Sequence, residues 1–231
     1  MMQNRSRLVS VLKNILQVSR INQEMPNSPL PDHVCQEIKK EVGKVDCQML
    51  DFHLKEPLPP AEAEIIVADI FSKWNQIACN IFLLTNVGTK LPLHDHPKID
   101  GFIKPLTGKL LISSFSWLTK DEEADLIQKE QKIGQKPARF EGTKLISAQN
   151  PEIVSLSHEK GNVHSIEAME PSSSFFDALI PDYADRICEY YQIDEVYPVV
   201  GRIYWLQPVQ MIPSMQAMFY PTVQIPEVEC G

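Results

Sequence analysis

The chain has 231 residues, enough for one sizeable domain with extensions, and its 43 % hydrophobic and 23 % charged residues are ordinary for a globular protein. Its formal net charge of −8 argues against nonspecific nucleic-acid binding and against docking on an anionic membrane surface. No apolar run approaches the roughly 20 residues that a membrane helix needs. We therefore expect neither nucleic acid nor a membrane among the partners.

Cysteine usage indicates the compartment. The five cysteines, at positions 35, 47, 79, 188 and 230, form no Cys-x-x-Cys pair, and no secretory signal precedes them. An odd number of such cysteines is typical of reduced thiols in an intracellular protein, so we predict a cytoplasmic one. Residues 1–23 hold basic and serine residues but no acid, as transit peptides do, so mitochondrial targeting is the minority alternative.

Two helices are predicted at the start of the chain. Residues 5–22 place apolar side chains on one helical face, namely Leu8, Leu12, Ile15, Leu16 and Ile21. Prolines between Met25 and Pro31 end this helix. Asp32 is the expected N-cap of a second helix through Val42, with Val34 and Ile38 inward. We expect residues 1–60 to be a helical extension that packs on the following domain, residues 61–231.

The same extension contains residues that could bind zinc. They are His33, Cys35, Cys47 and His53. Their spacing matches no common zinc finger, so scattered core or surface residues are the favoured interpretation.

From Asn80 onward the hydrophobic pattern is that of β-strands. We predict strands at residues 78–86, 91–93, 100–106, 109–117, 144–147, 153–156, 163–168, 174–180 and 199–206. The charged stretch 119–139 interrupts them and is expected to be a surface loop or short helix rather than a binding tail. Short strands without long helices between them predict a mainly β, double-sheet barrel.

Histidines in residues 91–97 suggest a metal site. His94 and His96 lie two residues apart in a β-prone segment, and such residues share one face of a strand. Such a pair alone is more often surface or core histidines. Flanking glycines and a later Gly-x-x-His, Gly161 to His164, reverse that balance because together they form the skeleton of the two cupin motifs.

Cupins usually add a glutamate four or five residues after the second histidine. Here that place falls on Asp100 or Gly101, and the spacing to Gly108 favours Gly101. We therefore predict a three-histidine site, His94, His96 and His164. Asp100 would restore a carboxylate ligand only if it turned inward, against the strand alternation.

The ligand set limits the chemistry. Three neutral imidazoles leave a divalent ion its full charge and open positions, which suits a thiolate and O₂ bound together on Fe(2+). Zinc with three histidines and a water is the competing hydrolytic design.

Several motifs resemble the 2-aminoethanethiol (cysteamine) dioxygenase family and its relatives, the plant cysteine oxidases. The similarity covers about residues 80–206 in order, through the segments 91–97, 101–104, 106–108, 161–166, 175–181 and 188–191. It implies a cupin double-stranded β-helix, Fe(2+), and insertion of both atoms of O₂ into a thiol to give a sulfinate. The family's substrates are cysteamine and proteins or peptides with an N-terminal cysteine, whose oxidation can serve oxygen sensing.

The resemblance also implies roles for individual residues. His94, His96 and His164 match the family's iron ligands, and Asp177 matches an acidic residue near the iron pocket. Asp177 would contact the substrate amine or position water; the alternative is a structural salt bridge or hydrogen bond.

Two further positions match residues that can be crosslinked in the family. Cys188 and Tyr190 match a Cys-x-Tyr pair that can form a thioether in animal members, with unmodified packing residues as the alternative. Cysteine dioxygenase, a more distant relative, has its crosslinking cysteine near this point of the chain. Gly101 excludes that form of the crosslink here. The chain departs from the family at residues 98–100, Lys-Ile-Asp, where Gly-Met-His or similar is usual.

Three functions are therefore weighed. The first is an iron-dependent thiol dioxygenase in which the substrate thiolate and amine are further metal ligands. The others are a different metal-dependent cupin, an isomerase or hydrolase, and a non-catalytic cupin that acts as a binding module. The absence of heptads favours a monomer, and the choice between cysteamine and protein N-terminal cysteine stays open.

Overall fold

The structure, a computed structural model, describes residues 2–20, 28–52, 64–128, 130, 132–210 and 215–217. Its helices are α1 (Met2–Val18), α3 (Asp32–Val42) and α4 (Lys120–Ile127). Its strands are β1 (Ile65–Lys73), β2 (Ile77–Leu84), β3 (Lys90–His94), β4 (Asp100–Thr107), β5 (Lys109–Trp117), β6 (Lys136–Ser147), β7 (Val154–Leu156), β8 (Val163–Ala168), β9 (Ser173–Ile180), β10 (Tyr190–Gln192), β11 (Ile203–Val209) and β12 (Met215–Ala217).

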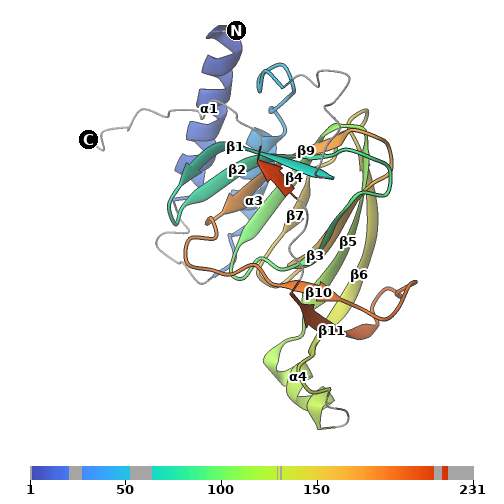
Figure 1. Cartoon of the computed structure of the whole chain (residues 1–231). Coiled ribbons are helices and arrows are strands. Elements are labelled where there is room, and N and C mark those ends of the chain that lie inside the picture. Colours follow the sequence, from blue (N-terminus) through green and yellow to red (C-terminus); the bar gives the residue numbers. More distant parts are fainter. Residues whose placement is uncertain are drawn as a thin grey trace.

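The strands form two facing sheets. One has the order β12-β1-β2-β9-β4-β7, and the other closes on itself in the order β10-β11-β6-β5-β8-β3 (Figure 1). Side chains from both sheets line one cavity between them. This is the double-stranded β-helix of the cupins, so the predicted mainly β fold class is confirmed.

Strand β9 shows how the layers are built. All eight of its residues are buried, although successive side chains point to opposite faces. Phe175, Asp177 and Leu179 line the cavity, whereas Phe176 and Ala178 belong to the core beneath the helices. The first sheet therefore separates the helix-covered core from the cavity.

The N-terminal helices pack on the outer face of this sheet (Figure 1). The predicted inward residues Leu8, Leu12 and Ile15 of α1 are buried, as are Val34 and Ile38 of α3. Helix α1 ends at Val18, earlier than expected.

Asp32 is not the N-cap of α3. The cap is Pro31, and no side-chain hydrogen bond closes this end of the helix. The Asp32 carboxylate lies in the first turn instead, where the helix dipole favours a negative charge.

Two buried polar contacts tie the helical segment to β4. The Lys104 ammonium donates to the backbone carbonyls of Gly43 and Val45. The Leu30 backbone N–H donates to Asp100 Oδ2 at 3.0 Å. The division near residue 60 stays a prediction, because the boundary falls in residues 53–63, outside the described part.

Other differences concern weak local signals. Strands β1, β10 and β12 were not predicted, and β6 begins at Lys136 rather than residue 144. The charged stretch forms the exposed helix α4, which projects from the barrel (Figure 1). A capping box between Thr119 and Glu122 starts this helix.

In the described residues, no helix combines the length and hydropathy that a membrane crossing requires.

Candidate metal centre

Three histidines converge at one end of the cavity. His94 ends β3, His164 lies opposite it on β8, and His96 follows two residues after β3. A β-bulge shifts the register between Leu91 and His94, and such irregularities re-aim side chains near functional sites. The three side chains are buried, and their ligand nitrogens lie within 4.8 Å of one another. The structure thus brings together the three histidines that the spacing singled out.

Hydrogen bonds orient two of the imidazoles. His94 Nδ1 lies 2.8 Å from the Pro92 carbonyl, to which it can only donate. His96 Nδ1 lies 2.8 Å from the Tyr183 hydroxyl, which itself donates to the Asp95 carbonyl at 2.9 Å. Nδ1 of His96 is therefore also the donor, and the Nε2 atoms of both rings present lone pairs to the site.

The arrangement fits a divalent metal ion. His94 Nε2 and His96 Nε2 are 3.1 Å apart, so two lone pairs would face each other without a cation between them. Ligands at about 2.1 Å from one ion and at right angles to each other lie about 3 Å apart. His164 Nδ1 has no hydrogen-bond partner among the described residues.

Burial also keeps the histidines in their ligand form. Desolvation lowers the pKa of His94 to about 4 and holds the pKa values of His96 and His164 well below their usual range. All three are therefore neutral near pH 7, as metal ligands must be.

A cavity of about 340 Å³ opens in front of the histidines. Phe82, Ile103 and Phe175 give it apolar walls. Cys188 and Tyr190 line another side, where β10 pairs with β3 and places Tyr190 opposite His94.

Cys188 and Tyr190 lie close together. The Cys188 thiol is within hydrogen-bonding reach of the hydroxyls of Tyr183 and Tyr190. Burial raises the pKa of Cys188 and raises that of Tyr190 to about 12. Both groups are therefore protonated near pH 7.

Asp177 points into the cavity without a partner. Its side chain is 6 % exposed, and its Oδ1 accepts no hydrogen bond from the described residues. Burial raises its pKa to about 7. The described residues form no ion pair with it, which argues against the structural salt bridge considered from the sequence.

Asp100 lies outside the histidine group. Its Oδ2 accepts the Leu30 N–H and lies 3.6 Å from His158 Nε2, and burial raises its pKa to about 6. The carboxylate therefore faces the N-terminal segment, and the only metal-ligand cluster within the described residues consists of the three histidines.

The zinc alternative finds no support in the described region. His33, Cys35 and Cys47 do not gather into a ligand cluster there. His53 lies outside the described residues.

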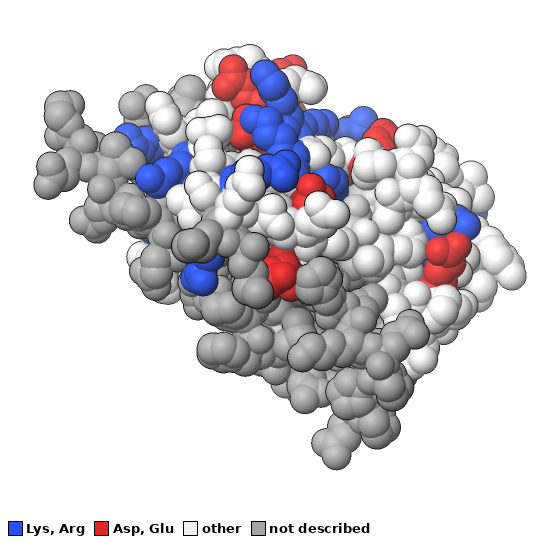
Figure 2. Space-filling view, turned by 90° about the horizontal axis from the view of Figure 1, so that it is seen from above, with Lys and Arg blue, Asp and Glu red and all other residues white. Residues whose placement is uncertain are grey.

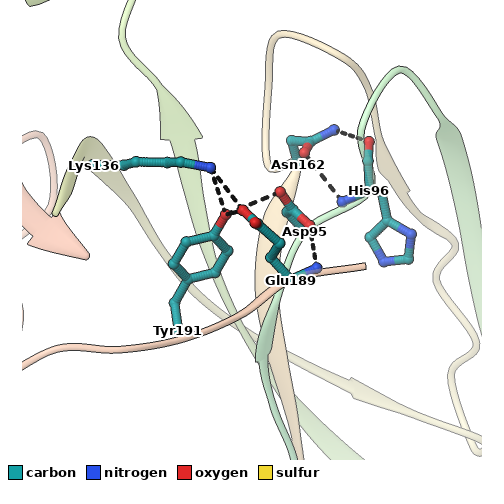
Figure 3. Close-up of polar contacts among 6 residues, drawn as sticks. All are labelled: Asp95, His96, Lys136, Asn162, Glu189 and Tyr191. Atoms are coloured by element: carbon teal, nitrogen blue, oxygen red, sulfur yellow. Dashed lines mark hydrogen bonds and ion pairs between the residues drawn. The ribbon is translucent and has the colours of Figure 1, made fainter. Parts of the chain in front are cut away.

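Sequence patterns did not reveal the residues that hold the histidine segment. Asn162 brackets His96 by accepting its backbone N–H at 3.2 Å and donating to its carbonyl at 2.6 Å (Figure 3). Asn162 lies within the Gly-x-x-His motif, and its position two residues before His164 was the only signal available.

A second set, here called the Asp95 clamp, consists of Asp95, Lys136, Glu189 and Tyr191 (Figure 3). Asp95 Oδ1 accepts the Glu189 N–H at 2.9 Å, and Asp95 Oδ2 lies 3.1 Å from the Tyr191 hydroxyl. Lys136 Nζ donates to Glu189 Oε2 at 2.7 Å and to the Tyr191 hydroxyl at 3.3 Å. The clamp fastens the strand that carries Tyr190 to the segment between His94 and His96.

Known proteins match most of this architecture. A family model described as PCO_ADO matches residues 36–218. Human 2-aminoethanethiol dioxygenase is 29 % identical over 156 residues, which cover 61 % of this chain and 56 % of the human protein. The mouse protein of the same name is 28 % identical, with coverages of 62 % and 59 %, so the chain spans somewhat over half the length of these relatives.

Solved structures show low similarity. KdgF from Halomonas sp. aligns with a TM-score of 0.37 and 14 % identity, covering 58 % of this chain and 92 % of that one. A cupin superfamily protein from Desulfitobacterium hafniense aligns with a TM-score of 0.34 and 10 % identity, covering 56 % and 94 %. The family model, by contrast, spans both histidine segments, Asp177 and the strand with Tyr190. The chain therefore belongs to the PCO_ADO family.

Proposed function

We propose that the protein is an Fe(2+)-dependent thiol dioxygenase that converts a thiol to a sulfinate with O₂. One observation carries the proposal: three neutral, buried imidazoles converge beside a cavity, and no carboxylate of the described residues joins them. Such a ligand set leaves the ion positively charged and open to substrate. The human and mouse relatives are named 2-aminoethanethiol dioxygenases, which supports the same reaction class here.

The reaction balances without a further reductant. Both atoms of O₂ bond to the sulfur, the thiol proton leaves to solvent, and the electrons that reduce O₂ come from the sulfur. Iron held by His94, His96 and His164 would bring thiolate and O₂ together and favour the thiolate.

The chain's own residues prepare this chemistry. The hydrogen bonds at Pro92 and Tyr183 fix two of the imidazoles, and apolar side chains form part of the cavity wall. In this proposal Asp177 contacts the substrate amine, and Cys188 and Tyr190 lie beside the thiol. Their proximity also permits the thioether that the family resemblance implies, with O₂ as the oxidant; intact-protein mass spectrometry would show its formation as the loss of two hydrogen atoms.

The proposed substrates are cysteamine or the N-terminal cysteine of a peptide or protein, the latter serving oxygen sensing. A reducing cytoplasm suits a free thiol substrate and the unpaired cysteines Cys35, Cys47, Cys79 and Cys188.

One experiment tests the function. Iron-loaded protein is incubated aerobically with cysteamine, free cysteine and a peptide that begins with cysteine, and mass spectrometry follows the gain of two oxygen atoms. We expect cysteamine or the peptide to gain them with iron but not with zinc. Product from free cysteine alone would contradict the branch, and no product from any thiol would favour another metal-dependent cupin or a binding module.

A further inference from the structure

Lys136 approaches a wall of the cavity from the side that faces away from the metal site. It is the first residue of β6, and its side chain is half exposed. Its ammonium donates to Glu189 Oε2 at 2.7 Å and to the Tyr191 hydroxyl at 3.3 Å (Figure 3). It also lies 5.8 Å from the ring centroid of Trp117 and 5.7 Å from that of Tyr191. Two aromatic rings and a carboxylate thus hold one ammonium group in place.

The Tyr191 hydroxyl has one proton and two carboxylate neighbours. It lies 3.1 Å from Asp95 Oδ2 and 2.8 Å from Glu189 Oε2, and it can donate to only one of them at a time. Burial and the two carboxylates raise the pKa of Tyr191 well above its usual range, so the hydroxyl keeps its proton. The Lys136 ammonium supplies the donor that Glu189 would otherwise lack, which leaves the tyrosine proton for Asp95.

The segment that carries Tyr191 also forms part of the cavity wall. Successive side chains of an extended segment point to opposite sides. Cys188 and Tyr190 accordingly line the cavity, whereas Glu189 and Tyr191 belong to the clamp. Tyr190 lies opposite His94 in the strand pairing, and the ring centroids of the two are 6.0 Å apart. A shift of the clamp would therefore move the cavity wall beside the site histidines.

The backbone alone holds this segment weakly. Strand β10 has three residues, and its pairing with β3 involves a single residue pair, Tyr190 and His94. A strand with so few pairings has a low local stability. The side-chain contacts of Glu189 and Tyr191 therefore contribute much of its fixation.

An ordinary surface ion pair would not have this consequence. The Lys136 and Glu189 side chains are 51 % and 47 % exposed, and such pairs contribute little to stability. Basic and acidic side chains also lie next to one another on the face seen in Figure 2. Lys136 differs by its second contact, because the Tyr191 hydroxyl connects it to Asp95, the residue between the first two site histidines.

We propose that Lys136 is a positioning residue for the metal site: its ammonium fixes the segment that presents Cys188 and Tyr190 to the cavity. The effect on turnover rests on the proposed function, whereas the effect on the position of Cys188 does not. Removal of the charge leaves one hydroxyl proton for two carboxylates, so the segment 188–191 separates from Asp95 more often. Cys188 then becomes more accessible, and Tyr190 spends less time at its place in the cavity.

Alkylation of the cysteines measures the position of this segment without turnover. The full chain is treated with iodoacetamide, and peptide mass spectrometry follows each free thiol separately. Lys136→Met keeps the long apolar stem but loses the charge. We expect Cys188 to react about tenfold faster than in the wild type, as the loss of one charge-assisted hydrogen bond predicts. Cys47 and Cys79, which pack in the core beneath the helices, should react at their wild-type rates.

Two further variants serve as controls. Lys136→Arg retains a positive charge with several donors, and it should keep Cys188 at wild-type reactivity. Lys144→Met removes a similarly exposed lysine from the same strand, where it pairs with Glu152, and it should leave Cys188 unchanged.

Turnover of cysteamine gives a second readout. Lys136→Met should lower kcat about tenfold, which is the lower end of what the outer partners of a metal site contribute. It should change KM much less, because the rest of the cavity wall stays in place. The unfolding midpoint in urea should stay close to that of the wild type, since the ion pair is exposed. A general loss of stability would instead lower the midpoint and expose all the cysteines together.

The outcomes separate the two proposals. Wild-type reactivity of Cys188 in Lys136→Met would overturn the positioning role, as would an equal increase at Cys47 and Cys79, or a Lys136→Arg chain that reacts like Lys136→Met. Selective exposure of Cys188 in a protein that forms no sulfinate would support the positioning role and contradict the dioxygenase. Sulfinate formation with the same kcat in the wild type and in Lys136→Met would do the reverse.

Discussion

The Asp95 clamp and the cavity carboxylates contrast within one small region. In the clamp, both Asp95 oxygens have partners, and the hydroxyl of Tyr191 lies between the carboxylates of Asp95 and Glu189. In the cavity, Asp177 and Asp182 each keep an unpartnered oxygen. Asp95 is as buried as the two cavity aspartates, so burial of the carboxylate alone does not tell the two sets apart.

The difference indicates what each set does. Buried polar groups with partners contribute to a unique, stable arrangement. Buried groups without partners reduce stability, and proteins retain them where a ligand will satisfy them. Stability should therefore depend on the clamp, and substrate recognition on the cavity.

The largest expected effect is at the metal itself. His164→Ala removes one of three ligands, and we expect the loss of iron and of turnover to exceed the roughly 100-fold that an outer partner contributes. Metal analysis measures the loss of iron, and O₂ consumption measures the loss of turnover. His33→Ala, at an exposed position on α3, is the control and should retain both. Full iron content in His164→Ala would remove this residue from the site.

Tyr183→Phe should have the next largest effect. The variant keeps the ring but loses the hydroxyl that accepts from His96 Nδ1 and donates to the Asp95 carbonyl. We expect iron affinity to fall about 10- to 100-fold with little loss of stability. Competition with a chelator measures it, and unchanged affinity would show that Tyr183 does not orient His96.

Asp95→Ala breaks the clamp. Removing the carboxylate leaves the Glu189 N–H and the Tyr191 hydroxyl without their Asp95 partner, and the lost hydrogen bonds should cost about 1–3 kcal/mol of unfolding free energy. Urea denaturation of the metal-free protein measures the loss. Asp185→Asn, at an exposed position, is the control and should stay within about 0.5 kcal/mol of the wild type.

Asp177→Asn should change stability with the opposite sign, in a way that depends on pH. The pKa of Asp177 is about 7 in the folded state, above the usual aspartate value. Between these two pKa values, the folded state therefore binds more protons than the unfolded state. This carboxyl group therefore lowers the unfolding free energy as pH rises from about 4 to about 7.

The variant lacks this titration, so its stability relative to the wild type should increase over the same window. Denaturation of both metal-free proteins at several pH values measures the difference and cancels the shared histidine contributions. A pH-independent difference would show that Asp177 is not desolvated as the structure indicates.

Much of the fold was predictable because its signals are local. β-prone apolar runs bounded by turn residues located β4, β5, β8 and β9, and the spacing of His94, His96 and His164 indicated their convergence. The signal failed where it was weak or remote: β1 has a mixed composition, and β10 has only three residues held by pairing with β3 and β11.

The site was predictable only in part for the same reason. A two-residue spacing places His94 and His96 near each other, but nothing in the sequence links Asp95 to Tyr191, which lies 96 residues away. The Asp182 carboxyl likewise accepts a hydrogen bond from the backbone of Asn75, which lies far away in the sequence. Contacts between distant segments decide which polar residues are satisfied, and hence which are available to a ligand.

Isotope labelling tests the central claim most directly. Iron-loaded protein and its His164→Ala variant react with cysteamine under isotopically labelled dioxygen, and mass spectrometry reads the label in the product. The account predicts a sulfinate with two labelled oxygen atoms from the wild type and none from the variant. A product that carries oxygen from water, or equal labelling in the variant, would contradict it.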